Sequence, residues 1–339
     1  MGLKKWILSI ALILSFSTTY FAQDTNQTVE NDSLAPIVYS EANDYIHIYK
    51  NRITARLFFV NTSNSLSVID HENDINYDLA ANKQNRIGAS LAFRAINISY
   101  SFAPDFLSEN KDNDDSKLFN FNIRTYLGKH WMQTLEIYKE KGFYIQNDDI
   151  SFYLPRTKFF KIGGATSYIL NENFSFRAIA SQDEKQLKSV GSFIPSLVYY
   201  YTYYHVIWDM ANPEDSIDGK SHSFDIALAP SYYYNFVPTK NLFISAGFSI
   251  GLGMHYSKEE SGSETSLLSE VNLRGSVNYD IDNLYLGSHY NLLVLNYNTD
   301  SAINVSDNIP YFQIFVGYRF KAGRKMIKTA DEFNNKLKL

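Results

Sequence analysis

The sequence predicts an all-β fold, a transmembrane antiparallel β-barrel of 12 to 14 strands behind an N-terminal signal peptide. Three observations predict it. Aromatic residues make up 16% of the 339 residues, although 20% are charged and the mean hydropathy is slightly negative. Apolar side chains alternate with small or polar ones over segments longer than the roughly five or six residues usual in soluble sheets. The chain also opens with a short apolar run behind two lysines.

The N-terminus has the features of a secretory signal peptide. Lys4 and Lys5 precede an apolar run over residues 6–16, and small and polar residues follow up to Ala22. The run is about half as long as the ~20 residues that a transmembrane helix needs. We therefore assign residues 1–22 to a signal peptide that is cleaved after Ala22. The chain has no cysteine, so it has no lipobox.

Alternation begins after a polar, acidic stretch over residues 23–50, which we assign to a periplasmic N-terminal leader. It is clearest from Leu242 to Tyr256, where every second residue is apolar and the residues between are mostly serine and glycine. A strand of this length exceeds the ~9 to 11 residues that cross a bilayer as a tilted strand. In a soluble sandwich the polar face would be the outer surface, whereas in a membrane barrel it lines the lumen.

Thirteen segments are candidate strands: 53–61, 86–93, 96–102, 117–126, 131–138, 157–170, 174–181, 192–204, 223–236, 242–256, 267–280, 284–297 and 311–320. Single-chain bacterial barrels have an even number of strands, so one assignment must fail. Short turns counted from the two ends of the chain conflict at residues 182–191. Either this segment contains a further crossing, or residues 62–85 contain an extra strand near 66–69.

The predicted barrel spans residues 51–320 and ends on the aromatic Phe320. Such an ending resembles the C-terminal strand signal that the barrel assembly machinery reads. A basic tail follows over residues 321–339, in which Met326, Ala330, Phe333 and Leu337 recur at helical spacing. We expect this tail in the periplasm, as a frayed end or as a short helix with one apolar stripe.

Three stretches are distinctive: Asp44-Tyr45-Ile46 to Tyr49-Lys50 with Ile53-Thr54-Ala55-Arg56-Leu57; Phe176-Arg177-Ala178 with Gln182, Glu184, Gln186, Lys188-Ser189 and Gly191-Ser192-Phe193; and Phe315-Val316-Gly317-Tyr318-Arg319-Phe320. Together they resemble a Bacteroidota-type outer-membrane family catalogued as domain of unknown function 4421. The resemblance covers residues 44–320 and implies an outer-membrane barrel with no assigned activity. Pro195 and the added tail depart from the family's pattern.

The middle stretch places polar and charged residues where the strand parity fails. They form a candidate luminal segment: Gln182, Glu184, Gln186, Lys188 and Ser189. A charge in a lumen with little water needs a partner. The candidate partners are Arg124, Arg177 and Arg274, and the alternative is an exposed loop.

Histidine and serine positions decide whether the barrel could be an enzyme, because most barrel enzymes activate a serine with a histidine. His289 follows Ser288 directly, so the two lie on opposite faces of a strand. His255 is predicted to face the lumen near a strand end, where it meets either a loop serine, such as Ser261 or Ser263, or only structural neighbours. We assign no catalytic residue.

The acidic run over residues 112–115 is the one candidate for a cation site, since hard cations bind clustered oxygens. It lacks the glycine and the terminal glutamate of an EF-hand loop, and a solvated loop is the simpler interpretation. We expect no metal site and no cofactor.

These features predict a protein of the outer membrane that acts as a narrow pore or as a scaffold for envelope proteins. About a dozen strands leave an interior that side chains largely fill. The alternative is a barrel enzyme that modifies lipid or lipid A. Expected partners are outer-membrane lipid and lipopolysaccharide, the barrel assembly machinery and a small solute. A net charge of −5 argues against nucleic acid.

Overall fold

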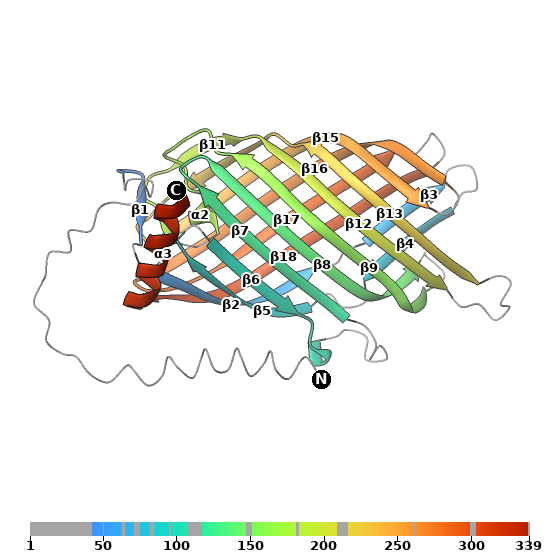
Figure 1. Ribbon diagram of the computed structural model, residues 1–339, viewed down its shortest axis with the longest axis horizontal. Helices are drawn as coiled ribbons and strands as arrows, with labels where there is room; N and C mark the ends of the chain where they lie inside the picture. Colours follow the sequence, from blue (N-terminus) through green and yellow to red (C-terminus); the bar gives the residue numbers. More distant parts are fainter. Residues whose placement is uncertain are drawn as a thin grey trace, which may run out of the picture. The chain divides into compact units, whose positions relative to one another are not determined.

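The computed structural model describes residues 43–49, 51–62, 65–70, 75–81, 85–94, 96–107, 117–146, 151–180, 183–208, 216–259, 262–298 and 303–337. The predicted signal peptide and most of the predicted leader lie outside these residues. Figure 1 shows the described strands wrapped into a barrel.

Twelve of the described strands close into an antiparallel ring. In ring order they are β2 (Arg52–Thr62), β5 (Asn85–Phe93), β6 (Ile96–Phe102), β7 (Lys117–Leu127), β8 (Trp131–Gln146), β9 (Ser151–Tyr168), β12 (Ser196–Trp208), β13 (Ile217–Leu228), β15 (Leu242–Glu259), β16 (Gly262–Ile281), β17 (Leu284–Asn298) and β18 (Ile303–Lys321). β18 pairs with β2, from Tyr311 opposite Thr62 to Lys321 opposite Arg52, and this pairing closes the ring. The predicted antiparallel barrel of 12 to 14 strands is confirmed.

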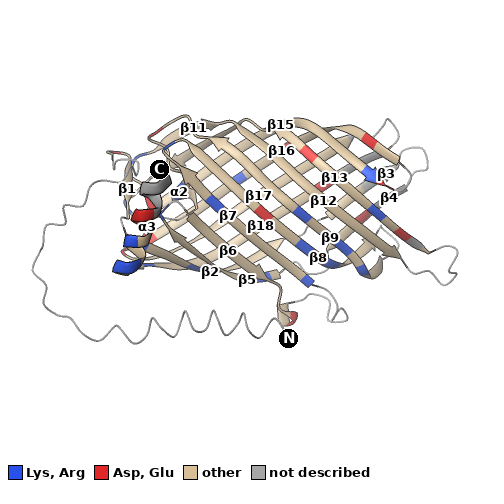
Figure 2. Cartoon of the chain, in the orientation of Figure 1, with Lys and Arg blue, Asp and Glu red and all other residues tan. Residues whose placement is uncertain are grey.

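The two faces of the ring differ as the alternation predicts. On β15, Phe248 and Leu252 expose 42% and 61% of their surface on the outside, whereas Ser245 and Ser249 are buried on the inside. Charged residues are sparse along the strands, and most positions of the strands carry neutral side chains (Figure 2). The outer face is therefore an apolar belt, and the inner face is polar.

Four further strands lengthen the wall without adding to the ring. β11 (Val190–Ile194) and β14 (Ser231–Phe236) pair with each other and continue β12 and β13 beyond Pro195 and Pro230. Proline has no N–H donor, so it interrupts a strand ladder at these points. At the opposite end, β3 (Ser65–Asp70) and β4 (Ile75–Ala81) form a hairpin that pairs with β18 and with β8.

The β3–β4 hairpin replaces β6 and β7 where these two strands end. β4 pairs directly with β8, with Ala81 opposite Phe143, just beyond the last pair of β7 with β8, Lys117 opposite Lys141. The register of β8 shifts here, and Gly142 takes a φ of 88°. Only glycine adopts this φ without strain, so Gly142 allows β8 to change partners.

The prediction of a strand over residues 174–181 is wrong. A short helix, α2 (Phe176–Ile179), forms there instead. Ser175 caps α2, because its backbone is extended and its Oγ accepts a hydrogen bond from the Ala178 amide at 2.9 Å. Phe174 and Phe176 alternate with polar residues over too short a stretch to separate a strand from a helical turn. Without this strand, the remaining candidates are the twelve of the ring. The strands β3 and β4 lie within the predicted range 62–85, but they add no strand to the ring.

Several short elements lie at the end of the barrel where the β5–β6, β7–β8 and β16–β17 connections are short, which we call the turn end. β1 (Ile46–Ile48) pairs with β10 (Glu184–Gln186), with His47 opposite Lys185. The predicted basic tail forms α3 (Arg324–Leu337), and Figure 1 places β1, α2 and α3 together at this end. At the opposite end of the barrel, one 3-10 turn, η1 (Asp105–Leu107), follows β6 in the described residues. No helix in the described residues is long and apolar enough to cross a membrane.

Candidate functional site

Residues 171–180 and 183–189 leave the wall after β9, and the chain rejoins the wall at β11. We call these residues the inner segment. Within them, α2 is buried inside the turn end of the ring. Phe174 and Phe176 belong to an apolar cluster with wall residues: Tyr126, Met132, Ile169, Ile194 and Tyr233. Burying each of the two phenylalanines contributes roughly 1.5 to 3 kcal/mol. This cluster fixes the inner segment to the side of the ring formed by β7, β8, β9, β11 and β14.

Gln186 holds the inner segment together. It exposes 1% of its surface and uses both ends of its amide. Its Oε1 accepts hydrogen bonds from the Ser175 amide at 2.9 Å and from Asn235 Nδ2 at 3.0 Å. Its Nε2 donates to the carbonyl oxygens of Tyr45 at 3.1 Å and Asn173 at 2.8 Å. A glutamine amide has two donors and two acceptor positions, so all of them are occupied.

Buried charges meet in the same segment. Arg177 Nη1 lies 3.3 Å from Asp183 Oδ2 and 3.5 Å from Glu184 Oε1, and Ser175 Oγ donates to Glu184 Oε2 at 2.6 Å. All four residues are buried. Burial raises the pKa of Asp183 to about 6, although Arg177 opposes the shift. One guanidinium therefore faces two carboxylates, and Asp183 is the acid that gains a proton more readily than in water.

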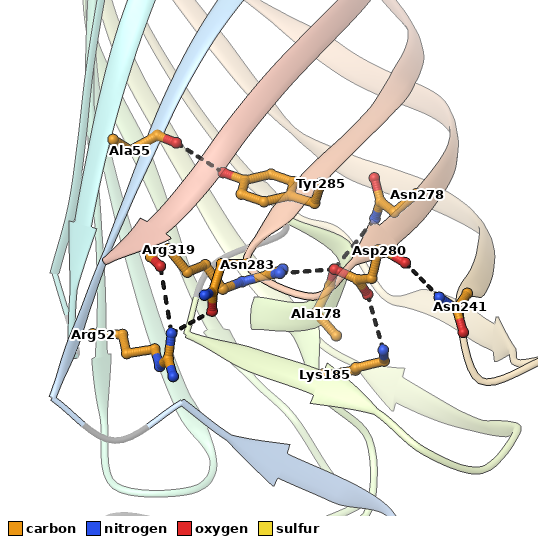
Figure 3. Close-up of polar contacts among 10 residues, drawn as sticks. All are labelled: Arg52, Ala55, Ala178, Lys185, Asn241, Asn278, Asp280, Asn283, Tyr285 and Arg319. Carbon is orange, nitrogen blue, oxygen red and sulfur yellow. Dashed lines mark hydrogen bonds and ion pairs between the residues drawn. The ribbon is translucent and has the colours of Figure 1, made fainter. Parts of the chain in front are cut away.

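The other side of the inner segment is held by polar contacts to the opposite wall. Asn278 Nδ2 of β16 donates to the Ala178 carbonyl at 3.4 Å, and Arg56 of β2 donates to the Ala180 carbonyl. Lys185 Nζ lies 3.3 Å from Asp280, which also pairs with Arg319 of β18 at 2.7 Å. Figure 3 shows Lys185 and Arg319 approaching the Asp280 carboxylate from two sides. We call the contacts of Asn278, Arg56 and Asp280 the latch.

A cavity of about 390 Å³ lies within the ring, and Phe176, Ile179 and Ala180 of the inner segment line part of it. Its charged lining consists of Arg56, Arg86, Arg124, Lys161 and Arg274 with Glu136, Glu140, Asp225, Glu270 and Asp307. Tyrosine, serine and asparagine side chains supply most of the remaining polar lining. The cavity is therefore lined by charged and polar side chains together with apolar ones, and the inner segment lies at its turn end.

The residues proposed from sequence are only partly brought together. Glu184 and Gln186 are buried in the inner segment, and Arg177 pairs with Glu184. Lys188 keeps 54% of its side chain exposed beside Asp44, and Ser189 Oγ accepts from the Val237 amide at 2.9 Å. Gln182 lies outside the described residues.

The other two proposed arginines face the cavity away from those acids. The guanidinium of Arg124 lies 5.5 Å from the ring centre of Phe176, and Arg274 Nε donates to Asn291 at 2.9 Å.

Sequence reasoning missed Ser175, Asn235, Asn278 and Asp280. Asn235 lies on the polar face of β14, and Asn278 and Asp280 lie on that of β16, so the alternation could have placed these three residues on the inner face. Ser175 precedes Phe176, the first residue of α2. Nothing local to these residues shows which part of the chain they meet.

The enzyme alternative finds no support in the histidine geometry. His255 Nδ1 lies 2.5 Å from Asp225 Oδ1, and its ring packs against Tyr297 with centroids 4.4 Å apart. His289 contacts the Ile179 backbone and Gln313. Within the described ranges no histidine forms a hydrogen bond to a serine hydroxyl. Ser261 and the acidic run 112–115 lie outside those ranges.

A closed antiparallel ring with an apolar outer belt and a polar interior is the architecture of an outer-membrane β-barrel, because closure leaves no unpaired backbone edge in lipid. The protein is an outer-membrane barrel whose outer face contacts lipid. The chain belongs to the family described as Domain of unknown function (DUF4421), whose family model matches residues 30–320. No curated protein shows a significant match to the sequence.

Solved structures with related folds are distant. The COG4313 outer membrane channel from Pseudomonas putida F1 is 8% identical, with 83% of this chain and 99% of that chain covered and a TM-score of 0.38. The β domain of the Bordetella autotransporter BrkA is 9% identical, with 80% and 100% covered and a TM-score of 0.38. The outer membrane protease OmpT from Escherichia coli is 8% identical, with 83% and 100% covered and a TM-score of 0.31. At such TM-scores these likenesses carry no argument about function, and the assignment to the outer membrane rests on the geometry of the barrel itself.

Proposed function

We propose that the protein is a narrow pore for small hydrophilic solutes and that the inner segment is its gate at the periplasmic end. The observation that carries this proposal is the asymmetric attachment of the inner segment. Apolar packing of Phe174 and Phe176 fixes one side, whereas the opposite side is held by hydrogen bonds and one ion pair. Water replaces polar contacts at little net cost, because each is worth only about 0.5 to 1.5 kcal/mol over its hydrated state. Apolar packing has no such substitute.

Breaking the latch would therefore leave the inner segment attached through Phe174 and Phe176. The cavity supports a passage, because charged and polar side chains form part of its lining and Ile179 and Ala180 border it. Movement of α2 away from β16 and β2 would connect this cavity to the turn end. In this proposal the turn end faces the periplasm, residues 1–22 are a signal peptide and residues 23–50 are a periplasmic leader.

The test is single-channel conductance in planar bilayers. Residues 183–188 are replaced by an equal length of Gly-Ser, which removes the Lys185 contact of the latch and the internal contacts of Asp183, Glu184 and Gln186 but leaves Phe174 and Phe176. We expect a larger conductance or a larger open fraction than in the wild type. A replacement of residues 324–329 of α3 by Gly-Ser, away from the cavity lining, is the matched control. Unchanged conductance in a variant that still shows the heat-dependent gel mobility of a folded barrel would contradict the pore proposal.

A scaffold for envelope proteins is the second candidate, and α3 favours it. Arg94 holds Asp331 of this helix at 2.5 Å, and the Ala322 amide donates to the Asn51 carbonyl at 2.8 Å, so the tail is tied to the turn end. If the gate variant conducts no more than the wild type, this surface becomes the better account. Contacts with lipopolysaccharide, and recognition of the strand ending at Phe320 by the barrel assembly machinery, are part of either proposal.

A further inference from the structure

Arg86 is a buried cation for which the described part of the chain provides no hydrogen-bond or ion-pair partner. It lies on the inner face of β5, exposes 4% of its surface and lines the cavity. It forms no hydrogen bond or ion pair with any other described residue, and its Nε is buried and unsatisfied. Taking a guanidinium out of water costs several kcal/mol unless a counter-charge and hydrogen-bond acceptors replace the water. Among the described residues, neither a counter-charge nor a hydrogen-bond acceptor offsets this cost for Arg86.

A second arginine in the cavity is in the same condition. Arg124 of β7 contacts the ring face of Phe176 and forms no hydrogen bond or ion pair within the described residues. Its Nε is also buried and unsatisfied. The hydroxyl of Tyr311 lies within electrostatic range of both Arg86 and Arg124, and of Arg56. All three guanidinium groups therefore lie around this hydroxyl, which is also within electrostatic range of Glu136.

The wall between the two arginines leaves room for a ligand. Arg124 lies opposite Asn97 in the β6–β7 ladder, and Ser90 of β5 lies opposite Ser99 of β6. Ser90, Asn97 and Ser99 all line the cavity with short side chains. The volume of about 390 Å³ falls in the lower part of the range of small-molecule sites, roughly 300 to 1,000 Å³.

One of the carboxylates that line the cavity, Glu136, is already engaged. Glu136 accepts hydrogen bonds from Asn122 at 3.0 Å, from Tyr138 at 2.9 Å and from Tyr200 at 2.9 Å. Three neutral donors therefore satisfy Glu136 without either unpaired arginine.

We propose that this region of the cavity binds an oxyanion, the carboxylate or phosphate group of a small solute, between Arg86 and Arg124. A guanidinium presents paired N–H donors that match two oxygens of such a group. The bound anion would pair with the arginines and occupy the space over Ser90 and Ser99. The inference rests on the proposed pore only for the route by which the solute arrives, since binding itself requires no current.

The experiment measures thermal unfolding of the purified full chain in detergent against increasing inorganic phosphate, with chloride adjusted to keep the ionic strength constant. We expect the wild type to show a saturable rise in melting temperature, because a ligand that binds only the folded state stabilises it. Arg86→Gln weakens the apparent affinity for phosphate by about tenfold or more, since it removes a charged, paired donor.

A second readout separates ligand binding from a structural role. In phosphate-free buffer, Arg86→Gln raises the melting temperature, because the unpaired buried charge is gone. A structural arginine would show the opposite sign. Arg156→Gln makes the same chemical change at an exposed position of β9 and alters neither quantity. Arg124→Gln repeats the test if Arg86→Gln fails to fold.

Two outcomes would overturn the proposal. One is the absence of a saturable phosphate effect in the wild type. The other is an Arg86→Gln variant that loses stability without phosphate and keeps the phosphate response. Neither outcome depends on conductance, so failure of this site leaves the pore proposal standing, and failure of the pore proposal leaves this test intact.

Discussion

Lys185 of the inner segment and Arg319 of β18 share one carboxylate, that of Asp280, with Lys185 Nζ at 3.3 Å from Oδ2 and Arg319 Nη1 at 2.7 Å from Oδ1. The side chain of Arg319 is 3% exposed and that of Lys185 is 22% exposed. Asp280 therefore neutralises a buried wall cation and, with its second oxygen, holds the inner segment. We expect the two contacts to contribute different amounts to the free energy of unfolding.

Asp280→Ala should destabilise the folded barrel by about 3 to 5 kcal/mol, because Arg319 is left buried and unpaired. Lys185→Met should cost about 1 kcal/mol or less, since Asp280 keeps Arg319 and Lys185 is partly solvated. Urea unfolding in detergent micelles measures both free energies of unfolding. Equal losses from the two variants would show that Lys185 bears more of the charge balance than its exposure indicates.

Gln186→Ala should destabilise the inner segment by about 1 to 3 kcal/mol for each buried partner left unsatisfied, among them the Ser175 amide. Lys188 lies two residues further along the chain, and its side chain is exposed. Lys188→Ala should therefore change stability by less than about 1 kcal/mol. Hydrogen exchange at the Ser175 and Ala178 amides reports the local effect. Protection that survives Gln186→Ala unchanged would mean that another group fixes α2.

Phe248→Arg should cost about 2 to 4 kcal/mol, because residue 248 points into lipid from the outer face of β15. Ser249→Arg, one residue further on the same strand, places the same side chain in the cavity near Glu270 and should cost less. Folding titrations into lipid vesicles compare the two. Similar costs at both positions would argue that the faces of β15 are wrongly assigned.

The attachment of the inner segment should weaken as pH rises from about 4 to about 6. The pKa of Asp183 in the folded chain, about 6, lies above its unfolded value of 3.8, so the folded state binds the proton more tightly. The stabilisation is complete below the unfolded value and is lost as pH rises through the folded one. Open fractions in planar bilayers at pH 4 and pH 7 test this sign. Asp183→Asn should remove the dependence, and a dependence that persists in this variant must come from other groups.

The barrel was predictable because side chains alternate between the two faces of a strand, and this alternation is visible in consecutive residues of the sequence. Leu242 to Tyr256 shows its two faces without reference to any other segment, and the parity of the strands located a fault at residues 182–191, next to the wrongly predicted strand over 174–181. The nature of that fault was not predictable, since Phe174, Ser175 and Phe176 fit the start of a strand as well as a capped helix. Tertiary packing against Tyr126 and Tyr233 decides between them.

The site was less accessible than the fold. Lys185 and Asp280 are neighbours only because α2 turns back inside a closed ring, and no local pattern encodes that contact. The sequence analysis did not single out Arg86, because its lack of a partner among the described residues depends on every inward side chain around it. The polar segment was found from its composition, whereas its anchor and its latch required the structure.

The measurement that tests the central claim most directly is the accessibility of a thiol in the cavity from each side of a planar bilayer. The natural chain has no cysteine, so Ser99→Cys introduces a single thiol on the cavity lining. A membrane-impermeant sulfonated thiol reagent is added to the chamber that faces the turn end. If the inner segment is the gate, modification is slow while residues 183–188 are intact and fast when they are replaced by Gly-Ser. Equal rates from the turn end in both proteins would contradict the account.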